Sequence, residues 1–269
     1  MKILNTVVFY ENREEVENYI SEVAEIADDD MVDIVLVVNS DKQNQVGAVE
    51  AALRSKGVDC FSVIDYGDNV GYLNTMLKTI KQVDIDRYDY IILSNTDIQY
   101  STKDFFQRLA EKEYPADVGC IAPCVYATQS NSYSNPHYSE RIPKAKLERL
   151  VKIFRYPLLG KWYLKLAELK AGKTRTEKKP SSYVYSPHGC YMIFTRDFIK
   201  TIYGYEYGVK MYSEESAVGE LLARNGLRCF YDDSISVIHQ ESSVTGKINY
   251  KRRFFAWRES LEYILKEFY

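Results

Sequence analysis

The chain has 269 residues, 46% of them hydrophobic, so it is long enough to bury the core of one large domain or of two small ones. Its net charge of −3 argues against a dedicated nucleic-acid-binding protein. Its five cysteines are scattered without a CxxC pair, a pattern that favours reduced thiols over a disulfide framework or a zinc site.

Two features of the sequence predict a cytoplasmic protein. The stretch 1–15 lacks the apolar segment and the cleavage site of a signal peptide. No apolar run approaches the roughly 18 residues that a membrane-spanning helix needs.

The first 125 residues alternate between strand and helix patterns. Strands are predicted at 3–10, 32–39, 59–65, 88–94 and 118–125, and helices at 14–27, 46–56, 72–82 and 101–111. The run 32–39 is apolar throughout, which is typical of a strand buried on both faces of a parallel sheet. The alternation predicts an α/β fold with a mostly parallel central sheet flanked by helices.

The rest of the chain breaks this rhythm. Residues 126–182 read as an insertion, first polar and then basic, with helices at 147–154 and 162–171. A strand at 184–194 follows, then a helix from Glu214 to Asn225-Gly226, and two strands, 228–231 and 236–239, separated by a turn at Asp232-Asp233. We expect one domain with halves 1–125 and 183–245, the insertion between them and a helical tail at 246–269.

Polar residues follow the second and third predicted strands. The loop 67–74 carries Gly67, Asn69, Gly71 and Asn74, and glycines between a strand and a helix let backbone N–H groups approach a diphosphate. A tight turn that needs Gly and Asn for its backbone is the alternative. Polar groups at 38–41 are placed to bind a nucleoside or to form a simple turn.

A second polar cluster, Asn95-Thr96-Asp97, ends the fourth strand. Asp97 is placed to coordinate Mg²⁺ or Mn²⁺ carrying substrate phosphates, and an Asn/Asp turn is the alternative. His239 is a candidate metal ligand or diphosphate contact, or else a structural histidine. The chain has only three histidines, which argues against a His-rich zinc site.

Glu214 and Glu215 open a predicted helix as neighbours. Adjacent helical residues point about 100° apart, so the two cannot form the opposed carboxylate pair of a glycosidase. A carboxylate at a helix N-terminus is stabilised in its charged form, which suits a base that takes a proton from a hydroxyl group. Ordinary acidic residues in a first helical turn are the alternative.

In this order, the motifs resemble the family 2 inverting glycosyltransferases of the GT-A fold, in particular the bacterial rhamnosyltransferase-like and capsule or O-antigen enzymes. The resemblance covers residues 3–243. In the first half, Tyr10-Glu11-Asn12 is similar to the family's Tyr-Asn motif with a Glu inserted, and Asn95-Thr96-Asp97 is similar to a variant of its DxD motif. The loop residues Asn69, Gly71 and Asn74 also match the family. In the second half, the matching parts are the acceptor-side strand His188-Gly189-Cys190-Tyr191-Met192, the pair Glu214-Glu215, and His239. Val38-Asn39-Ser40-Asp41 departs from the family's Asp-Asn-x-Ser.

The resemblance implies a transferase that uses a dTDP-, UDP- or GDP-linked sugar, Mg²⁺ or Mn²⁺, and a glycan or lipid-linked acceptor in bacterial surface polysaccharide synthesis. Glu215 is then the general base, with Glu214 as second choice, and Asp97 and His239 bind the metal. His188 and Gly189 lie on the acceptor side. The donor-binding residues are Tyr10, Asn12, Asn39, Asp41, Asn69, Gly71, Asn74 and Asn95.

Other classes of function stay open. A nucleotidyltransferase usually carries a Gly-rich basic loop after its first strand, which residues 9–14 lack. A non-catalytic sugar-nucleotide or glycan-binding module would tolerate loss of Glu215 and Asp97. The basic and aromatic stretch 251–258 and the basic insertion also suggest contact with an anionic membrane at its inner face, with a solvated basic helix as the alternative.

Overall fold

The structure is a computed structural model that describes residues 1–27, 31–40, 46–171, 177–241 and 250–269. In these residues a ten-stranded sheet has the order β3-β2-β1-β4-β9-β6-β10-β5, with β7 paired to β6 and β8 paired to β10. Asp41, one of the predicted donor-binding residues, lies outside the described residues.

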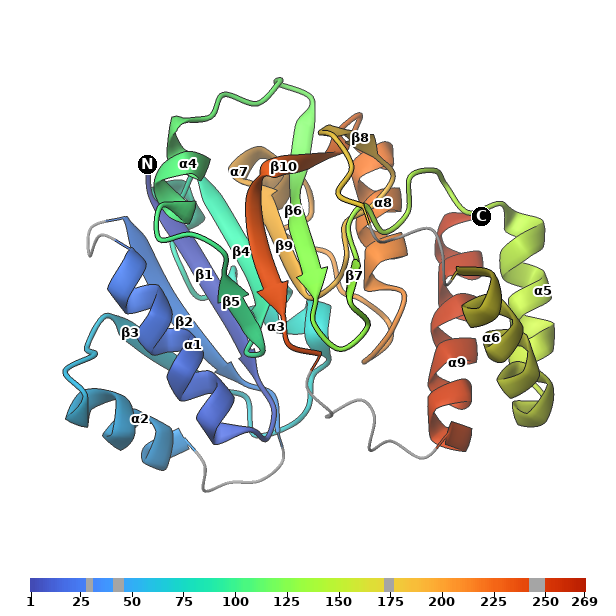
Figure 1. Ribbon diagram of the computed structural model, residues 1–269, viewed down its shortest axis with the longest axis horizontal. Helices are drawn as coiled ribbons and strands as arrows, with labels where there is room; N and C mark the ends of the chain where they lie inside the picture. Colours follow the sequence, from blue (N-terminus) through green and yellow to red (C-terminus); the bar gives the residue numbers. More distant parts are fainter. Residues whose placement is uncertain (28–30, 41–45, 172–176, 242–249) are drawn as a thin grey trace.

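The first half of the sheet is parallel and consists of β1 (Ile3–Phe9), β2 (Val32–Val38), β3 (Phe61–Asp65) and β4 (Tyr90–Asn95). Alternate residues of β1 enter two cores, because successive side chains of a strand point to opposite faces. One core contains the apolar faces of α1 (Arg13–Ile26), α2 (Val46–Ser55) and α4 (Phe105–Glu111), and the other contains that of α3 (Tyr72–Thr79). The N-terminal strands are therefore covered by helices on both faces (Figure 1).

The second half of the sheet is mixed. β9 (Tyr191–Thr195) is antiparallel to both β4 and β6 (Val118–Ala127), and β10 (Arg228–His239) is parallel to β6 and antiparallel to β5 (Ile98–Tyr100). The predicted parallel order thus describes β1 to β4 and the pair β6 and β10. Because β9 runs the opposite way, its first residues lie beside the last residues of β4.

Two predicted boundaries are wrong. The strand expected at 184–194 is β8 (Ser182–Val184) and β9 with a loop between them, so His188 and Gly189 lie in a loop. Pro187 has no N–H to give to a strand ladder, which explains the break. The turn expected at Asp232-Asp233 is a bulge inside β10, since Asp232 pairs with Pro123 and Ser236 with the next residue, Cys124.

The buried carboxylate of Asp232 holds that bulge. It is fully buried, and it accepts hydrogen bonds from Lys112 Nζ at 2.7 Å, Tyr114 Oη at 2.6 Å and the backbone N–H of Ser234 at 2.9 Å. Lys112 and Tyr114 follow α4, far from β10 in sequence. The sequence around Asp232 therefore predicts a turn, because the residues that stabilise the bulge, Lys112 and Tyr114, lie elsewhere in the sequence.

Three helices form a block beside the sheet, α5 (Lys144–Phe154), α6 (Pro157–Ala171) and α9 (Tyr250–Phe268) (Figure 1). The rings of Phe154, Phe254 and Trp257 meet between them, with centroids 5.4 to 5.6 Å apart. Both insertion helices begin a few residues earlier than predicted, and α4 begins later, at Phe105. No helix in the described ranges is long and apolar enough to cross a membrane.

Three short elements and one longer helix complete the architecture. The short ones are the 3-10 helix Ile85–Arg87, β7 (Ser132–Tyr133) and α7 (Arg196–Thr201). The longer one, α8 (Glu214–Arg224), begins at Glu214 as predicted.

Candidate active site

Asp97 and His239 meet at the edge of the sheet. Asp97 lies in the two-residue link between β4 and β5, and His239 ends β10, opposite Ile98 in the antiparallel β5–β10 pair. The Oδ2 of Asp97 is 3.3 Å from the Nε2 of His239, and the side chains are only 9% and 13% exposed. Asp97 and His239 are far apart in the sequence, and the pairing of β5 with β10 brings them together.

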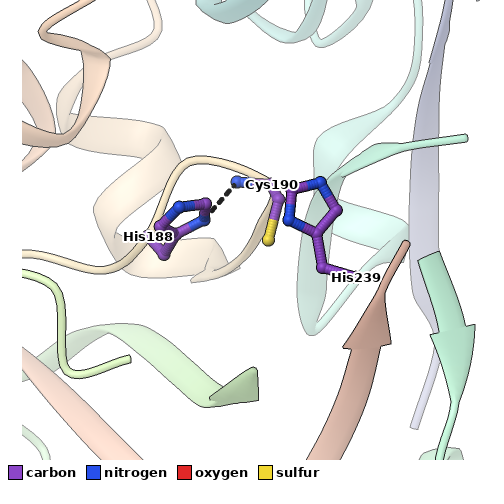
Figure 2. A group of neighbouring side chains, drawn as sticks. All are labelled: His188, Cys190 and His239. Atoms are coloured by element: carbon purple, nitrogen blue, oxygen red, sulfur yellow. Dashed lines mark hydrogen bonds between the residues drawn. The ribbon is translucent and has the colours of Figure 1, made fainter. Parts of the chain in front are cut away.

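His188 and Cys190 gather at the same place (Figure 2). One ligand atom from each of His188, Cys190 and His239 lies within 4.8 Å of the other two. The backbone N–H of Cys190 donates to Nδ1 of His188 at 3.2 Å. Burial raises the pKa of the Cys190 thiol well above its usual range, and the negative charges of Asp97 and Glu215 raise it further, so the thiol is neutral near pH 7.

Glu215 also contacts this loop. The backbone N–H of Gly189 donates to its Oε1 at 3.2 Å. A Cβ on residue 189 would lie 2.7 Å from the same oxygen, so only glycine leaves the carboxylate in this place. The loop 187–190 therefore carries a contact to Glu215, at Gly189, and two residues of the cluster with His239, His188 and Cys190.

Glu214 has a different environment from its neighbour. It is 8% exposed, and it follows Tyr212 and Ser213, which both adopt positive φ (72° and 61°) where the chain turns into α8. Burial, and then the negative charge of Glu215, raise the pKa of Glu214 from 4.5 to about 8. At neutral pH Glu214 is therefore mostly protonated.

The predicted donor loop is held by its own asparagines. Asn39 Oδ1 accepts the N–H of Val70 at 2.8 Å, and Asn69 Oδ1 accepts the N–H of Gly71 at 3.0 Å. Asn74 donates to the carbonyls of Val70 and Tyr207 and accepts from the N–H of Tyr207. These three side chains shape the loop and fasten it to the segment 207–210.

Tyr10, Asn12 and Asn95 take three different positions. Tyr10 follows β1 and is 38% exposed. Asn12 is the N-cap of α1, with its side chain accepting the N–H of Glu15 at 3.4 Å. Asn95 ends β4, where its N–H donates to the carbonyl of Cys190 at 3.0 Å and so joins β4 to the site loop.

A small cavity of about 120 Å³ adjoins Asp97 on the side of α1 and is lined by Glu15, Tyr19, Glu22 and Gln240 among others. Pockets for small molecules are usually about 300 Å³ or larger, so this cavity is too small for a nucleotide sugar.

Cys190 is the residue of the site that sequence reasoning did not single out. It was visible only as one position in the expected acceptor-side strand, and its two histidine neighbours are not both near it in sequence. The three residues of the cluster do not have the sequence spacing of a known metal-binding motif, so the cluster became apparent only in the fold.

The donor set at this edge fits a divalent metal ion. Asp97 offers a carboxylate, and Nδ1 of His239 is buried without a hydrogen-bond partner among the described residues. A buried imidazole nitrogen without a partner is costly unless something binds it. Carboxylate and imidazole groups are both common ligands of divalent ions in proteins.

The sheet order, the helices on both faces and the single antiparallel strand in the centre are the fold of the GT-A glycosyltransferases. Neither a protein-family model nor a curated protein sequence matches the chain.

Three solved structures illustrate the likeness. A mannosyltransferase from Pyrobaculum calidifontis, PcManGT in complex with GDP-Man and Mn²⁺, has a TM-score of 0.60 and 11% identity over 99% of this chain and 70% of its own. TarS 1–349 from S. aureus with UDP-GlcNAc has a TM-score of 0.55 and 12% identity over 93% of this chain and 62% of its own. GalNAc-T7 with UDP, GalNAc and Mn²⁺ has a TM-score of 0.55 and 13% identity over 89% of this chain and 44% of its own. The chain thus spans less than two thirds of the last two.

Proposed function

We propose that the chain is a glycosyltransferase that moves a sugar from a nucleoside-diphosphate donor to a hydroxyl group of a glycan or lipid-linked acceptor, with inversion at the anomeric carbon. The observation that carries the proposal is the arrangement of three groups around the loop 187–190. His239 of the Asp97–His239 pair lies beside His188 and Cys190 of this loop, and Glu215 is hydrogen-bonded to Gly189 of the same loop. A metal-binding pair and a base that meet at one loop are what a single displacement on a diphosphate-linked sugar needs.

The donor is proposed to be a GDP-, UDP- or dTDP-linked sugar. PcManGT is described with GDP-Man, and TarS with UDP-GlcNAc, on the same fold. The backbone of the loop 67–71, held by Asn39 and Asn69, together with Tyr10 and Asn95, forms the edge along which the nucleotide would bind. In this role the asparagines position the loop, and direct contact comes from backbone N–H groups.

Asp97 and His239 are proposed to hold Mn²⁺ or Mg²⁺ on the donor's phosphates. The ion, when bound, offsets the negative charge that grows on the departing nucleoside diphosphate. The chain's own part is to fix both ligands: the β5–β10 pairing sets His239 opposite Ile98, and the N–H of Gln240 donates to the carbonyl of Asp97 at 2.9 Å.

Glu215 is proposed as the general base. The raised pKa of Glu214 leaves Glu214 protonated at neutral pH, so Glu215 is the better of the two for accepting a proton. The N–H of Gly189 orients its carboxylate toward the loop. Glu215 takes the proton of the acceptor hydroxyl as that oxygen attacks the anomeric carbon, and a single displacement of this kind inverts the configuration.

The finer assignments belong to the same proposal. Four assignments rest on the motif resemblance alone. They are membership of family 2, a rhamnosyl or hexosyl donor, His188 on the acceptor side, and a role in bacterial surface polysaccharide synthesis at the cytoplasmic face of the membrane. The GT-A fold is compatible with them, and the family shares that fold with other transferases.

The test begins with a thermal-shift screen of sugar nucleotides with and without Mn²⁺, because a ligand that binds only the folded state raises the melting temperature. With the donor so found, Glu215→Gln should keep donor binding and lower transfer at least about a hundredfold. Glu113→Gln, which changes an exposed acid away from the site, is the control.

Three results would count against the proposal. Full transfer activity in Glu215→Gln would remove this residue as the base. Donor binding without transfer or donor hydrolysis would favour a binding module. Transfer that persists after chelation would remove the metal role of Asp97.

A further inference from the structure

Helix α6 exposes an apolar stripe. Leu158, Trp162, Leu166 and Leu169 are 71%, 68%, 54% and 74% exposed. They are spaced four, four and three residues apart, which puts them on one side of the helix. We call these four residues the α6 stripe. Leu159 and Tyr156 extend it, at 51% and 62% exposed.

The opposite side of α6 is already packed. At Gly160 an added Cβ would lie 2.7 Å from the ring of Phe254 on α9, so the two helices are in close contact there. Tyr163 meets the ring of Phe154 on α5 with centroids 6.3 Å apart. These contacts fix the rotation of α6, and they leave the stripe facing away from the protein.

The three helices of the block carry a net positive charge. Helices α5, α6 and α9 carry 12 basic and 5 acidic residues, a net charge of +7. The whole chain has a net charge of −3, so the positive charge is concentrated in this block. Leucine and tryptophan flanked by lysine and arginine is the composition of helices that lie in the interface of an anionic membrane.

We propose that the α6 stripe inserts into the interfacial layer of an anionic membrane, with basic side chains of α5, α6 and α9 binding the lipid headgroups. The sequence pattern indicated membrane contact by the stretch 251–258 of the tail and by the basic insertion. In the structure the apolar side of α9 is largely packed, with Phe254, Leu261 and Ile264 buried, and its exposed aromatic residues are Phe255 (57%) and Tyr250 (38%). The insertion helix supplies the apolar surface, and α9 supplies charge and support.

Helix α9 links this surface to the candidate active site. It packs on α6 through Phe254, and its Ser260 exchanges a hydrogen bond with Ser213 at 2.9 Å, one residue before Glu214. Its Trp257 also meets the ring of Tyr212 at 5.4 Å. This step rests on the proposed glycosyl transfer. Under that function, α9 contacts both the docking surface and the segment that leads to the proposed base. The class of acceptor that fits is a lipid-linked one.

The first experiment uses the two tryptophans of the chain, Trp162 and Trp257. Trp257→Phe leaves Trp162 as the only indole fluorophore. Vesicles of phosphatidylcholine with phosphatidylglycerol should shift its emission to the blue, and lipids brominated in the acyl chain should quench it. Vesicles of phosphatidylcholine alone should bind at least about tenfold more weakly, and added salt should weaken binding to the anionic vesicles.

The second experiment is flotation of the full chain with the same vesicles. The double variant Trp162→Ser with Leu166→Ser should lose about tenfold or more in vesicle affinity with an unchanged melting temperature, because both side chains are exposed. Tyr203→Ser, which changes an exposed aromatic residue on another element, is the matched control and should bind as the unmodified chain does.

Equal vesicle binding by the double variant and the control would overturn the proposal. So would a dimer in solution that the double variant converts to monomer without any vesicle binding, since a second copy would then be the occupant of the stripe. Loss of vesicle binding with sugar-nucleotide binding retained supports docking. Vesicle binding without any sugar-nucleotide binding would refute the proposed function and leave the docking surface standing.

Discussion

Glu214 is buried although it is ionisable and adjacent to another carboxylate. The positive φ angles of Tyr212 and Ser213 turn the chain so that the first residue of α8 points inward. Its neighbour Glu215 then points about 100° away, toward the loop 187–190. Two adjacent glutamates thus become a buried, mostly protonated acid and a half-buried carboxylate.

Glu214 should make the protein less stable as pH rises. Its pKa is about 8 in the folded chain against 4.5 ordinarily, so the folded state binds its proton more tightly than the unfolded state does. The stability that this provides is full below pH 4.5 and is lost as pH rises through 8. Relative to the unmodified chain, Glu214→Gln should gain on the order of 2–3 kcal/mol in free energy of unfolding between about pH 6 and pH 9. Urea unfolding at several pH values measures this.

Glu113→Gln is the control for that experiment, because it removes an exposed acid, and its pH dependence should follow that of the unmodified chain. Parallel pH curves for Glu214→Gln and the unmodified chain would show that Glu214 is not the group responsible.

The cluster of His188, Cys190 and His239 should make the site sensitive to zinc. Two imidazoles and a thiol are the ligands that Zn²⁺ prefers, and one atom from each already lies within 4.8 Å of the others. We expect Zn²⁺ to compete for His239 with the divalent ion proposed there, and more strongly as pH rises, because the thiol must lose its proton. Cys190→Ser should weaken Zn²⁺ binding by at least about tenfold, measured by calorimetry.

Cys60→Ser is the matched change, because Cys60 precedes β3 at the opposite edge of the sheet from β10. If both variants bind Zn²⁺ as the unmodified chain does, the cluster is not a zinc site.

At the scale of elements, the loop after β3 and the segment 207–210 fit against each other at Gly71. Its φ of 95° lies in the region that glycine favours, and an added Cβ would lie 2.6 Å from the carbonyl oxygen of Lys210. That oxygen accepts the N–H of Tyr72 at 3.2 Å. A side chain at residue 71 would therefore disturb both the loop backbone and the contact that holds it.

Gly71→Ala should accordingly lower the free energy of unfolding by about 2–4 kcal/mol. Gly67→Ala is the matched control, because residue 67 also has positive φ (67°) but an added Cβ meets nothing within 4 Å. It should cost only about 1 kcal/mol. Equal losses in urea unfolding would mean that strain in φ, and not the Lys210 contact, accounts for the effect.

Local pattern was enough to predict most elements and to single out Asp97 and His239, which the structure brings together at the candidate site. The apolar runs and their helical spacing placed the strands and helices of the first half, because each element depends mainly on its own residues. Asp97 and His239 were found because polar groups at strand ends meet at one edge of a sheet. The bulge at Asp232, the loop at His188 and the role of Cys190 were not, because each depends on residues distant in sequence.

At the scale of the whole molecule, one buried charge joins the insertion to α8. Glu220, which is 4% exposed, accepts hydrogen bonds from Nε and Nη2 of Arg141 at 2.7 and 2.8 Å and from the hydroxyl of Tyr185 at 2.8 Å. Arg141 also lies over the ring of Tyr269, 4.1 Å from its centroid, at the end of the chain. The insertion, α8 and the C-terminus therefore share one ion pair.

Removing Arg141 should loosen that junction. In Arg141→Met the carboxylate of Glu220 stays buried and keeps the hydroxyl of Tyr185 as a donor but loses its charged partner, and a buried charge without that partner costs about 2–3 kcal/mol of folding free energy. Arg108→Met is the matched control, since Arg108 is exposed to a similar degree (49% against 52%) but pairs with Asp104, which is itself 43% exposed. It should cost less than about 1 kcal/mol.

Urea unfolding gives both values, and proteolysis within the insertion should rise only in Arg141→Met. If the two variants lose the same stability, Glu220 finds other partners and the block of α5, α6 and α9 is held by its apolar contacts alone.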